Sequence, residues 1–275
     1  MEFKKILYQH KFRFSFTLVL ILTEALIGIL LPLFIGFAVD GVIKNDLYPV
    51  YQLGGLGIAI VVIGGLRRLV DSRFYGKLYL QISSKLMKNN TQEISIKTAR
   101  LNMLNEITEF MENQTPELIQ HIIALTGVTL IILSLNTKIF IYALFAGLFV
   151  ILIYWLSSKK ITQYNRDYND EMETQVNNLN KSWEDGLKLH IKRLVKTNIK
   201  LSDLETINFS LSWVAMSFFL VLVIIVSSSE GIIEYGALFA LIMYVYQYIE
   251  SVVSLPLFYQ QWLRLKEIYA RINTF

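Results

Sequence analysis

The chain of 275 residues contains no cysteine, which excludes disulfide bridges and thiolate metal sites. Histidine is also scarce, with three residues, so we expect no metal centre. A glycine-rich phosphate loop of the form GxxxxGK[ST] is missing, and the one Gly-Lys pair, Gly76-Lys77, is followed by Leu78 in a segment predicted to be helical. The sequence therefore predicts no ATP site, no bound cofactor and no enzymatic activity in this chain.

Charged residues are sparse at 17%, whereas hydrophobic residues make up 54% of the chain. The apolar residues gather in six runs of 18 to 26 residues, which cover 14–39, 48–66, 118–135, 139–156, 209–226 and 232–257. About 20 apolar residues in a helix cross the hydrocarbon layer of a membrane. We therefore expect an all-α membrane protein, in which residues 1–275 form one domain with six helices spanning the lipid bilayer.

The basic residues lie on alternate sides of these runs. All but two of the 26 lysines and arginines lie at the chain ends or in the connections 67–116 and 157–208, the exceptions being Lys44 and Lys138. The positive-inside rule places both termini and both long connections in the cytoplasm. Membrane topology thus explains the net charge of +4, and we expect no nucleic-acid partner. The expected location is a bacterial cytoplasmic (inner) membrane, which the chain crosses several times.

Each long connection has about 50 residues and very little glycine or proline. In the first connection Phe74, Leu78, Ile82 and Leu86 recur at every fourth position, which is typical of an amphipathic helix. We expect both connections to form helical hairpins that extend the spans into the cytoplasm.

A few ionisable and polar residues fall inside the apolar runs. Glu24 lies ten residues beyond Phe14, which is about 15 Å of helix and predicts a position near the bilayer midplane. Glu250 is predicted nearer the cytoplasmic side, on one helical face with Gln247 and beside Tyr244, and His121 near the cytoplasmic end of the third run. An ionisable group at membrane depth costs at least ~2.5–3.5 kcal/mol, so each is a candidate functional residue.

Two interpretations of these residues stay open. In the first, Glu24, Glu250 and His121 bind protons or substrate in a central cavity lined also by Gln247 and Tyr244. In the second, the carboxyl groups are protonated and form hydrogen bonds between helices, and His121 is a solvated or capping residue.

Local motifs at both ends of the chain resemble the transmembrane domain of ABC exporters. In the first run they are Leu31-Pro32, Gly36 and Val39-Asp40-Gly41; in the last they are Tyr235-Gly236-Ala237-Leu238, Ala240, Tyr244, Leu255-Pro256 and Ala270-Arg271-Ile272. The resemblance implies a six-span exporter fold assembled as a domain-swapped homodimer, in which spans four and five cross into the partner.

The resemblance also implies that the two cytoplasmic hairpins form a coupling or docking surface for an ATPase. The corresponding residues are Ser95, Lys97, Arg100, His190 and Lys192. The sequence departs from the family because the proline and glycine usual near 95–101 are missing, and because it ends at Phe275, where an ATPase domain would be expected to follow.

These features predict a membrane transporter of a mid-sized solute, such as a peptide, a siderophore or a similar small molecule. Because the sequence predicts no ATPase of its own, alternating access is expected to be coupled to the proton gradient through Glu24 and Glu250. One alternative is ATP supplied through a separately encoded ATPase subunit. A second alternative is a membrane assembly or regulatory module without transport. The sequence indicates neither the identity of the substrate nor the direction of transport.

Overall fold

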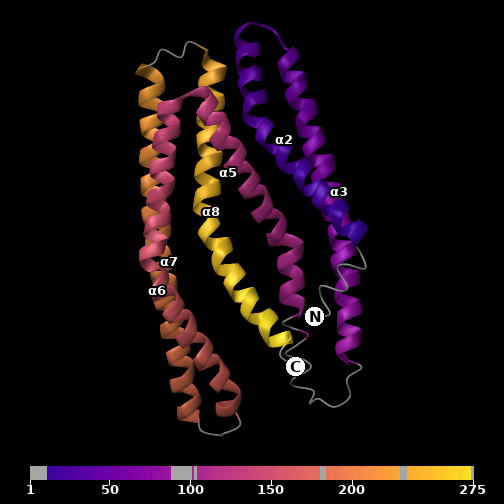
Figure 1. Ribbon diagram of the computed structural model, residues 1–275, viewed down its shortest axis with the longest axis vertical. Coiled ribbons are helices and arrows are strands. Elements are labelled where there is room, and N and C mark those ends of the chain that lie inside the picture. Colours follow the sequence, from indigo (N-terminus) through magenta and orange to yellow (C-terminus); the bar gives the residue numbers. More distant parts are fainter. Residues whose placement is uncertain (1–10, 88–100, 102–103, 180–183, 230–233, 274–275) are drawn as a thin grey trace. The chain divides into compact units, whose positions relative to one another are not determined.

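The computed structural model describes residues 11–87, 101, 104–179, 184–229 and 234–273, and the regular elements in these residues are helices (Figure 1). Six of the helices are long and apolar enough to cross a membrane, which confirms the expected all-helical chain with six such helices. The elements are α2 (Lys11–Ile43), α3 (Tyr48–Met87), the π-helical turn η1 (Phe110–Gln114), α5 (Thr115–Leu135), α6 (Thr137–Leu179), α7 (Glu184–Ser229) and α8 (Tyr235–Asn273).

The chain divides into two compact units. The first unit comprises residues 1–137 and 224–275 and so contains α2, α3, η1, α5 and α8. The second comprises residues 138–223 and contains most of α6 and α7.

Helix α2 is the centre of the first unit, because it packs against α3, α5 and α8. Its buried residues recur every three or four positions and include Thr17, Ile21, Ala25 and Ile29. Small residues on the neighbouring helices let them approach α2 closely. For example, a Cβ atom added to Gly127 of α5 would lie 2.7 Å from Ile29 Cδ1.

A tight turn joins α2 to α3. Asn45 adopts a left-handed conformation with φ of 57°, which a short polar residue tolerates at a helix end. The backbone N–H of Asp46 donates to the Gly41 carbonyl at 2.8 Å, and its carboxylate accepts the Tyr48 N–H at 3.0 Å. These bonds fix α3 as an antiparallel neighbour of α2.

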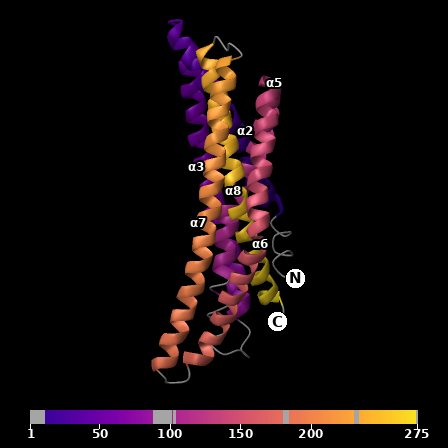
Figure 2. The same cartoon turned by 90° about the vertical axis from the view of Figure 1, so that its left-hand side faces the viewer.

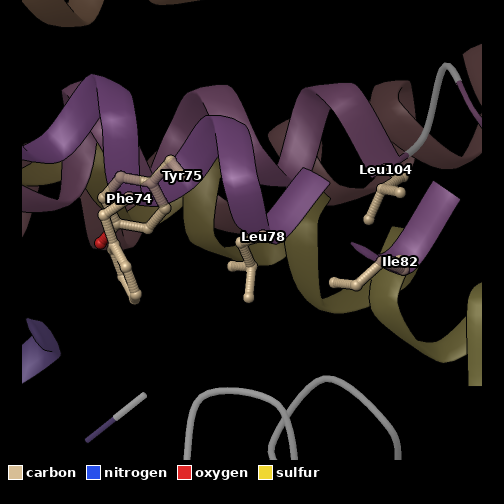
Figure 3. Close-up of a cluster of buried hydrophobic side chains, with 5 residues drawn as sticks. All are labelled: Phe74, Tyr75, Leu78, Ile82 and Leu104. Atoms are coloured by element: carbon tan, nitrogen blue, oxygen red, sulfur yellow. The ribbon is translucent and has the colours of Figure 1, made fainter. Parts of the chain in front are cut away.

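Helix α3 extends 21 residues past the apolar run that ends at Leu66. The extension is held by a cluster of buried side chains, with Phe74, Tyr75, Leu78 and Ile82 from α3 and Leu104 from the helical segment that leads to η1 (Figure 3). The four-residue periodicity of the sequence therefore marks a buried face at three positions, whereas the side chain of Leu86 lies outside the described residues.

The π-helical turn η1 ends at Gln114, two residues before Pro116. Proline has no N–H and its ring clashes with a carbonyl one turn earlier, so a regular α-helix cannot continue through it without a change. The wider turn accommodates it, with the Thr115 N–H bonded to the Phe110 carbonyl. The chain thus remains helical from Leu104 to Leu135.

In the second unit α6 and α7 form a long hairpin, and Figure 2 shows both helices along their length. Ser157 Oγ donates a hydrogen bond to Asn208 Oδ1 at 2.8 Å, and further along the hairpin the Lys200 ammonium lies 5.9 Å from the centre of the Tyr164 ring. These contacts join the parts of α6 and α7 that lie outside the apolar runs.

Candidate functional site

A group of charged side chains lies between α2 and α3. Arg67 of α3 donates from Nε to Glu24 Oε2 of α2 at 2.5 Å, and from Nη1 to Asp71 Oδ2 at 3.1 Å. Arg67 thereby bridges two carboxylates, one from each helix. We call these three residues, together with Thr17, the charge cluster.

The helix lengths explain why Glu24 meets Arg67. Glu24 lies 19 residues before Ile43, where α2 ends, and Arg67 lies 19 residues after Tyr48, where α3 begins. In an antiparallel pair both are about 28 Å from the turn. Arg67 also directly follows the apolar run 48–66. Glu24 therefore lies level with the end of the second apolar run, and its position near the bilayer midplane stays a prediction.

The charge cluster is closed on most sides. Thr17 and Asp71 are each 1% exposed and Arg67 is 8% exposed, whereas the Glu24 side chain is 20% exposed. Gly64 of α3 makes room for the Glu24 carboxylate, because a Cβ atom at this position would lie 3.0 Å from Glu24 Oε1. Glu24 is thus the more accessible end of the cluster and Asp71 is the enclosed end.

The enclosed end contains two polar atoms whose hydrogen-bonding capacity is unused. The Thr17 hydroxyl lies next to the Asp71 carboxylate. Nevertheless, within the described part of the chain, neither Thr17 Oγ1 nor Asp71 Oδ1 has a hydrogen-bond partner. One helical turn further on, the buried phenol of Tyr75 lies near Asp71 and near Glu112 of η1. Buried polar atoms without partners are costly, and a hydrogen bond between the Thr17 hydroxyl and the Asp71 carboxyl group would satisfy both.

The charges of the cluster do not balance. Glu24 and Asp71 carry two negative charges when ionised, and Arg67 carries one positive charge. A buried net charge is unfavourable, because the interior solvates it poorly. The cluster can therefore take up one positive charge.

The other candidate residues lie on α5 and α8. Glu250 is exposed on α8 and is close enough to His121 of α5 for the two charges to interact. The His121 ring also lies 5.5 Å from the ring of Phe258. The structure thus brings Glu250 and His121 together, while Glu24 joins Arg67 and Asp71.

Gln247 and Tyr244, three residues apart on α8, differ in burial. Gln247 is half-buried and its Oε1 atom has no hydrogen-bond partner among the described residues. Tyr244 is buried, with its hydroxyl near the backbone of Leu33 in α2. Tyr244 therefore contributes to the contact between α2 and α8.

One residue of the predicted coupling surface has a described side chain. Ser95, Lys97 and Arg100 lie outside the described residues, and so does the side chain of His190 in α7. Lys192 is exposed on α7.

Thr17, Arg67 and Asp71 are the members of the charge cluster that the sequence reasoning missed. Arg67 was assigned to the basic residues that set the membrane topology. A signal was nevertheless available, because Arg67 and Asp71 are four residues apart on one helical face. The short connection between the first two runs is a second signal. It predicts an antiparallel helix pair, in which residues equally distant from the connection are neighbours.

The comparisons with known proteins identify the family. Residues 3–236 match the family model described as ABC transporter transmembrane region. The comparison with curated proteins gives no match. The family match covers five of the six apolar helices and reaches the start of α8. The chain therefore belongs to the family of ABC transporter transmembrane regions.

Proposed function

We propose that this chain is one half of a membrane transporter that uses the proton gradient to move a mid-sized solute, such as a peptide or a siderophore. The observation that carries the proton coupling is the charge cluster, a buried group with one excess negative charge beside an apolar span. Such a group can bind a proton when enclosed and release it when water enters. Family membership supports the transport role.

The exposure of Glu250 supports a path built from two copies of the chain. Glu250 lies on the apolar helix α8 and is exposed in the single chain. A carboxylate facing lipid would cost at least ~2.5–3.5 kcal/mol, so a water-filled path or a second copy is the favourable surrounding. We propose that Gln247 and Glu250 line this path in a homodimer.

The α6–α7 hairpin supports a domain-swapped arrangement of that dimer. These two helices form a compact unit of their own, which is the behaviour expected of an arm that packs on a partner. The dimer would then open alternately to the two sides of the membrane.

Liposomes containing the purified protein test this function. An imposed pH gradient, acidic outside, is applied in the presence of a mixture of short peptides and ferric siderophores, and the vesicle contents are identified by mass spectrometry. We expect at least one compound to accumulate without ATP and an uncoupler to abolish its accumulation. Protein-free liposomes are the control. Uptake that persists at the wild-type rate with the uncoupler present contradicts proton coupling.

The Glu24→Gln variant tests the role of the charge cluster in the same liposomes. We expect uptake that no longer depends on the pH gradient, because the excess negative charge is gone. The matched control is Gln52→Glu, which adds a carboxylate at an exposed position of α3 near the outer turn. Wild-type uptake and coupling by Glu24→Gln would exclude Glu24 from the mechanism.

A second candidate function is the membrane subunit of a transporter driven by a separately encoded ATPase. Family membership favours it, and so does the exposed Lys192 in the second hairpin. Here ATP, together with a co-purifying ATPase subunit, would be required for uptake. Absence of uptake under both conditions, combined with a stable complex with another membrane protein, would indicate an assembly or regulatory module.

A further inference from the structure

The enclosed end of the charge cluster contains two buried oxygen atoms without a hydrogen-bond partner among the described residues. Asp71 Oδ2 accepts a hydrogen bond from Arg67, but Asp71 Oδ1 is buried with no partner among the described residues. Thr17 Oγ1 is in the same condition and lies beside it. The Thr17 hydroxyl can donate its own hydrogen to an ionised Asp71, and it can equally accept a hydrogen from a protonated Asp71, so the charges around the pair decide which form is favoured.

The surrounding residues favour a neutral Asp71 over an ionised one. Among the residues that the structure describes, the groups that face Asp71 are Thr17 and Glu24 from α2 and Arg67 and Tyr75 from α3, with Glu112 of η1 beyond Tyr75. Arg67 is the only cation among these groups, and it is shared with Glu24. Burial penalises the second carboxylate, and the negative charge of Glu24 adds to the penalty.

The accessibility of the two carboxylates indicates which one holds the hydrogen. The Asp71 side chain is 2% exposed and that of Glu24 is 20% exposed. The ionised form is therefore better solvated at Glu24. Buried apolar side chains, including Phe74 and Leu78, follow on the α3 extension one and two helical turns beyond Asp71 (Figure 3).

A metal ion fits this place less well than a proton. Among the residues that the structure describes, no three acidic or histidine side chains gather as ligands for a metal ion. The enclosed end offers one carboxylate oxygen and one hydroxyl, and an oxygen-liganded cation needs about six ligands. A proton needs one oxygen atom to bind and one to receive its hydrogen bond.

We propose that Asp71 is a proton-binding site, in which Oδ1 takes up one proton and the resulting O–H donates to Thr17 Oγ1. Asp71 Oδ2 keeps its hydrogen bond from Arg67, and Glu24 remains the carboxylate paired with Arg67. The bound proton brings the net charge of the cluster to zero. Its role in transport rests on the proposed proton coupling, in which water entering the cluster releases the proton from Asp71.

Infrared difference spectroscopy of the purified full chain in liposomes tests this site. Spectra recorded over a range of pH, in H₂O and in D₂O, detect the carbonyl stretch of a protonated carboxyl group. We expect a band at neutral pH that shifts in D₂O and disappears in alkali. We further expect Asp71→Asn to abolish it. The matched control is Asp203→Asn, an exposed aspartate of α7, which leaves the band unchanged.

Two further variants identify the carboxyl group even where Asp71→Asn fails to fold. Thr17→Val removes the acceptor, so the band should move to the frequency of a carboxyl group without a hydrogen bond. Glu24→Gln removes the excess charge, so the band should persist but appear only at lower pH. A band that Glu24→Gln abolishes at every pH assigns the proton to Glu24 and overturns the proposal. An unmoved band in Thr17→Val also overturns it.

Two more measurements complete the test. The first distinguishes a bound proton from a bound metal cation, and the second distinguishes the proton site from the transport function. If sodium chloride removes the band at constant pH while choline chloride does not, a metal cation competes for the site and the proton proposal is wrong. If the liposomes show no uptake but the band follows Asp71 as expected, the proton site stands and the proposed transport function fails.

Discussion

At the residue scale the charge cluster depends on one cation. Arg67 bonds to carboxylates on two helices, and its guanidinium group can serve both because its donors point in different directions. Removing Arg67 leaves Glu24 and Asp71 close together with no positive charge between them. Removing Glu24 instead leaves a neutral pair. The two losses should therefore differ strongly in their effect on stability.

We predict that Arg67→Gln lowers the free energy of unfolding by about 3–5 kcal/mol, because it removes the cation that Glu24 and Asp71 share. Glu24→Gln should cost clearly less. Thermal unfolding of the purified protein in detergent measures both effects. Arg68→Gln, at the exposed neighbouring position, is the control and should unfold as the wild type does. Equal melting temperatures for Arg67→Gln and Arg68→Gln would contradict the buried pairing.

At the element scale the last turns of α2 and the first turn of α8 are joined by backbone contact. A Cβ atom at Gly36 would lie 2.6 Å from the Gly236 carbonyl oxygen and 3.0 Å from Ala240 Cβ. Asp40 Oδ1 also accepts a hydrogen bond from the Gly236 N–H at 2.7 Å, so a side chain of α2 caps the first turn of α8. Gly36 and Gly236 are among the motif positions of the family resemblance, and the structure explains these two by close packing.

We predict that Gly36→Ala lowers the free energy of unfolding by about 1–3 kcal/mol, because the added methyl group forces two helix backbones apart. Gly54→Ala in α3 is the matched control, since a Cβ atom there meets no atom within 4 Å. In the control the higher helix propensity of alanine should leave stability unchanged or raise it by up to about 1 kcal/mol. Thermal unfolding in detergent compares the two variants, and an undiminished melting temperature for Gly36→Ala would rule out the close contact.

At the scale of the whole molecule the distribution of charge predicts the orientation in the membrane. The turn between α2 and α3 contains Lys44 and lies at the opposite end of α3 from Lys77. The two lysines are separated along α3 by about 43 Å, more than the thickness of the hydrocarbon layer. The positive-inside rule assigns the end with Lys77 to the cytoplasm.

The absence of cysteine gives a clean background for testing this orientation. We predict that a membrane-impermeant maleimide labels Lys44→Cys on intact cells from which the outer membrane has been removed. Lys77→Cys should react only after the cytoplasmic membrane is disrupted. Both positions are exposed, so unequal labelling reports the side of the membrane and not burial. Labelling of Lys77→Cys on intact cells would reverse the proposed topology.

The sequence predicted the elements of this fold well because each one depends on neighbouring residues. Long apolar runs predict the six helices, since only a helix satisfies its own backbone in lipid. The repeat of Phe74, Leu78 and Ile82 predicts an amphipathic extension, and all three are buried. The π-helical turn before Pro116 was not predicted. A proline in the sequence is equally compatible with a π-helical turn and with a break in the helix.

The candidate site was predicted only in part, because its contacts join residues far apart in the chain. Glu24 stood out as a carboxylate in an apolar run, but its partner Arg67 lies 43 residues away. The assignment of Arg67 to the topology signal hid its second role. The spacing of Asp71 from Arg67 was the one local signal for Asp71, and Thr17 gave none, since it is an ordinary residue near the end of a run.

The sequence alone therefore determined that the chain is helical, that it has six apolar spans and that it lacks cysteine, because composition and periodicity are local properties. Only the tertiary structure decided that Glu24 is paired with Arg67, that Asp71 is the enclosed carboxylate and that Gly36 meets Gly236. These contacts depend on the register between helices, which the α2–α3 turn and the small residues at the crossings set. The scarcity of charge limits the number of such sites, and the register places one of them between α2 and α3.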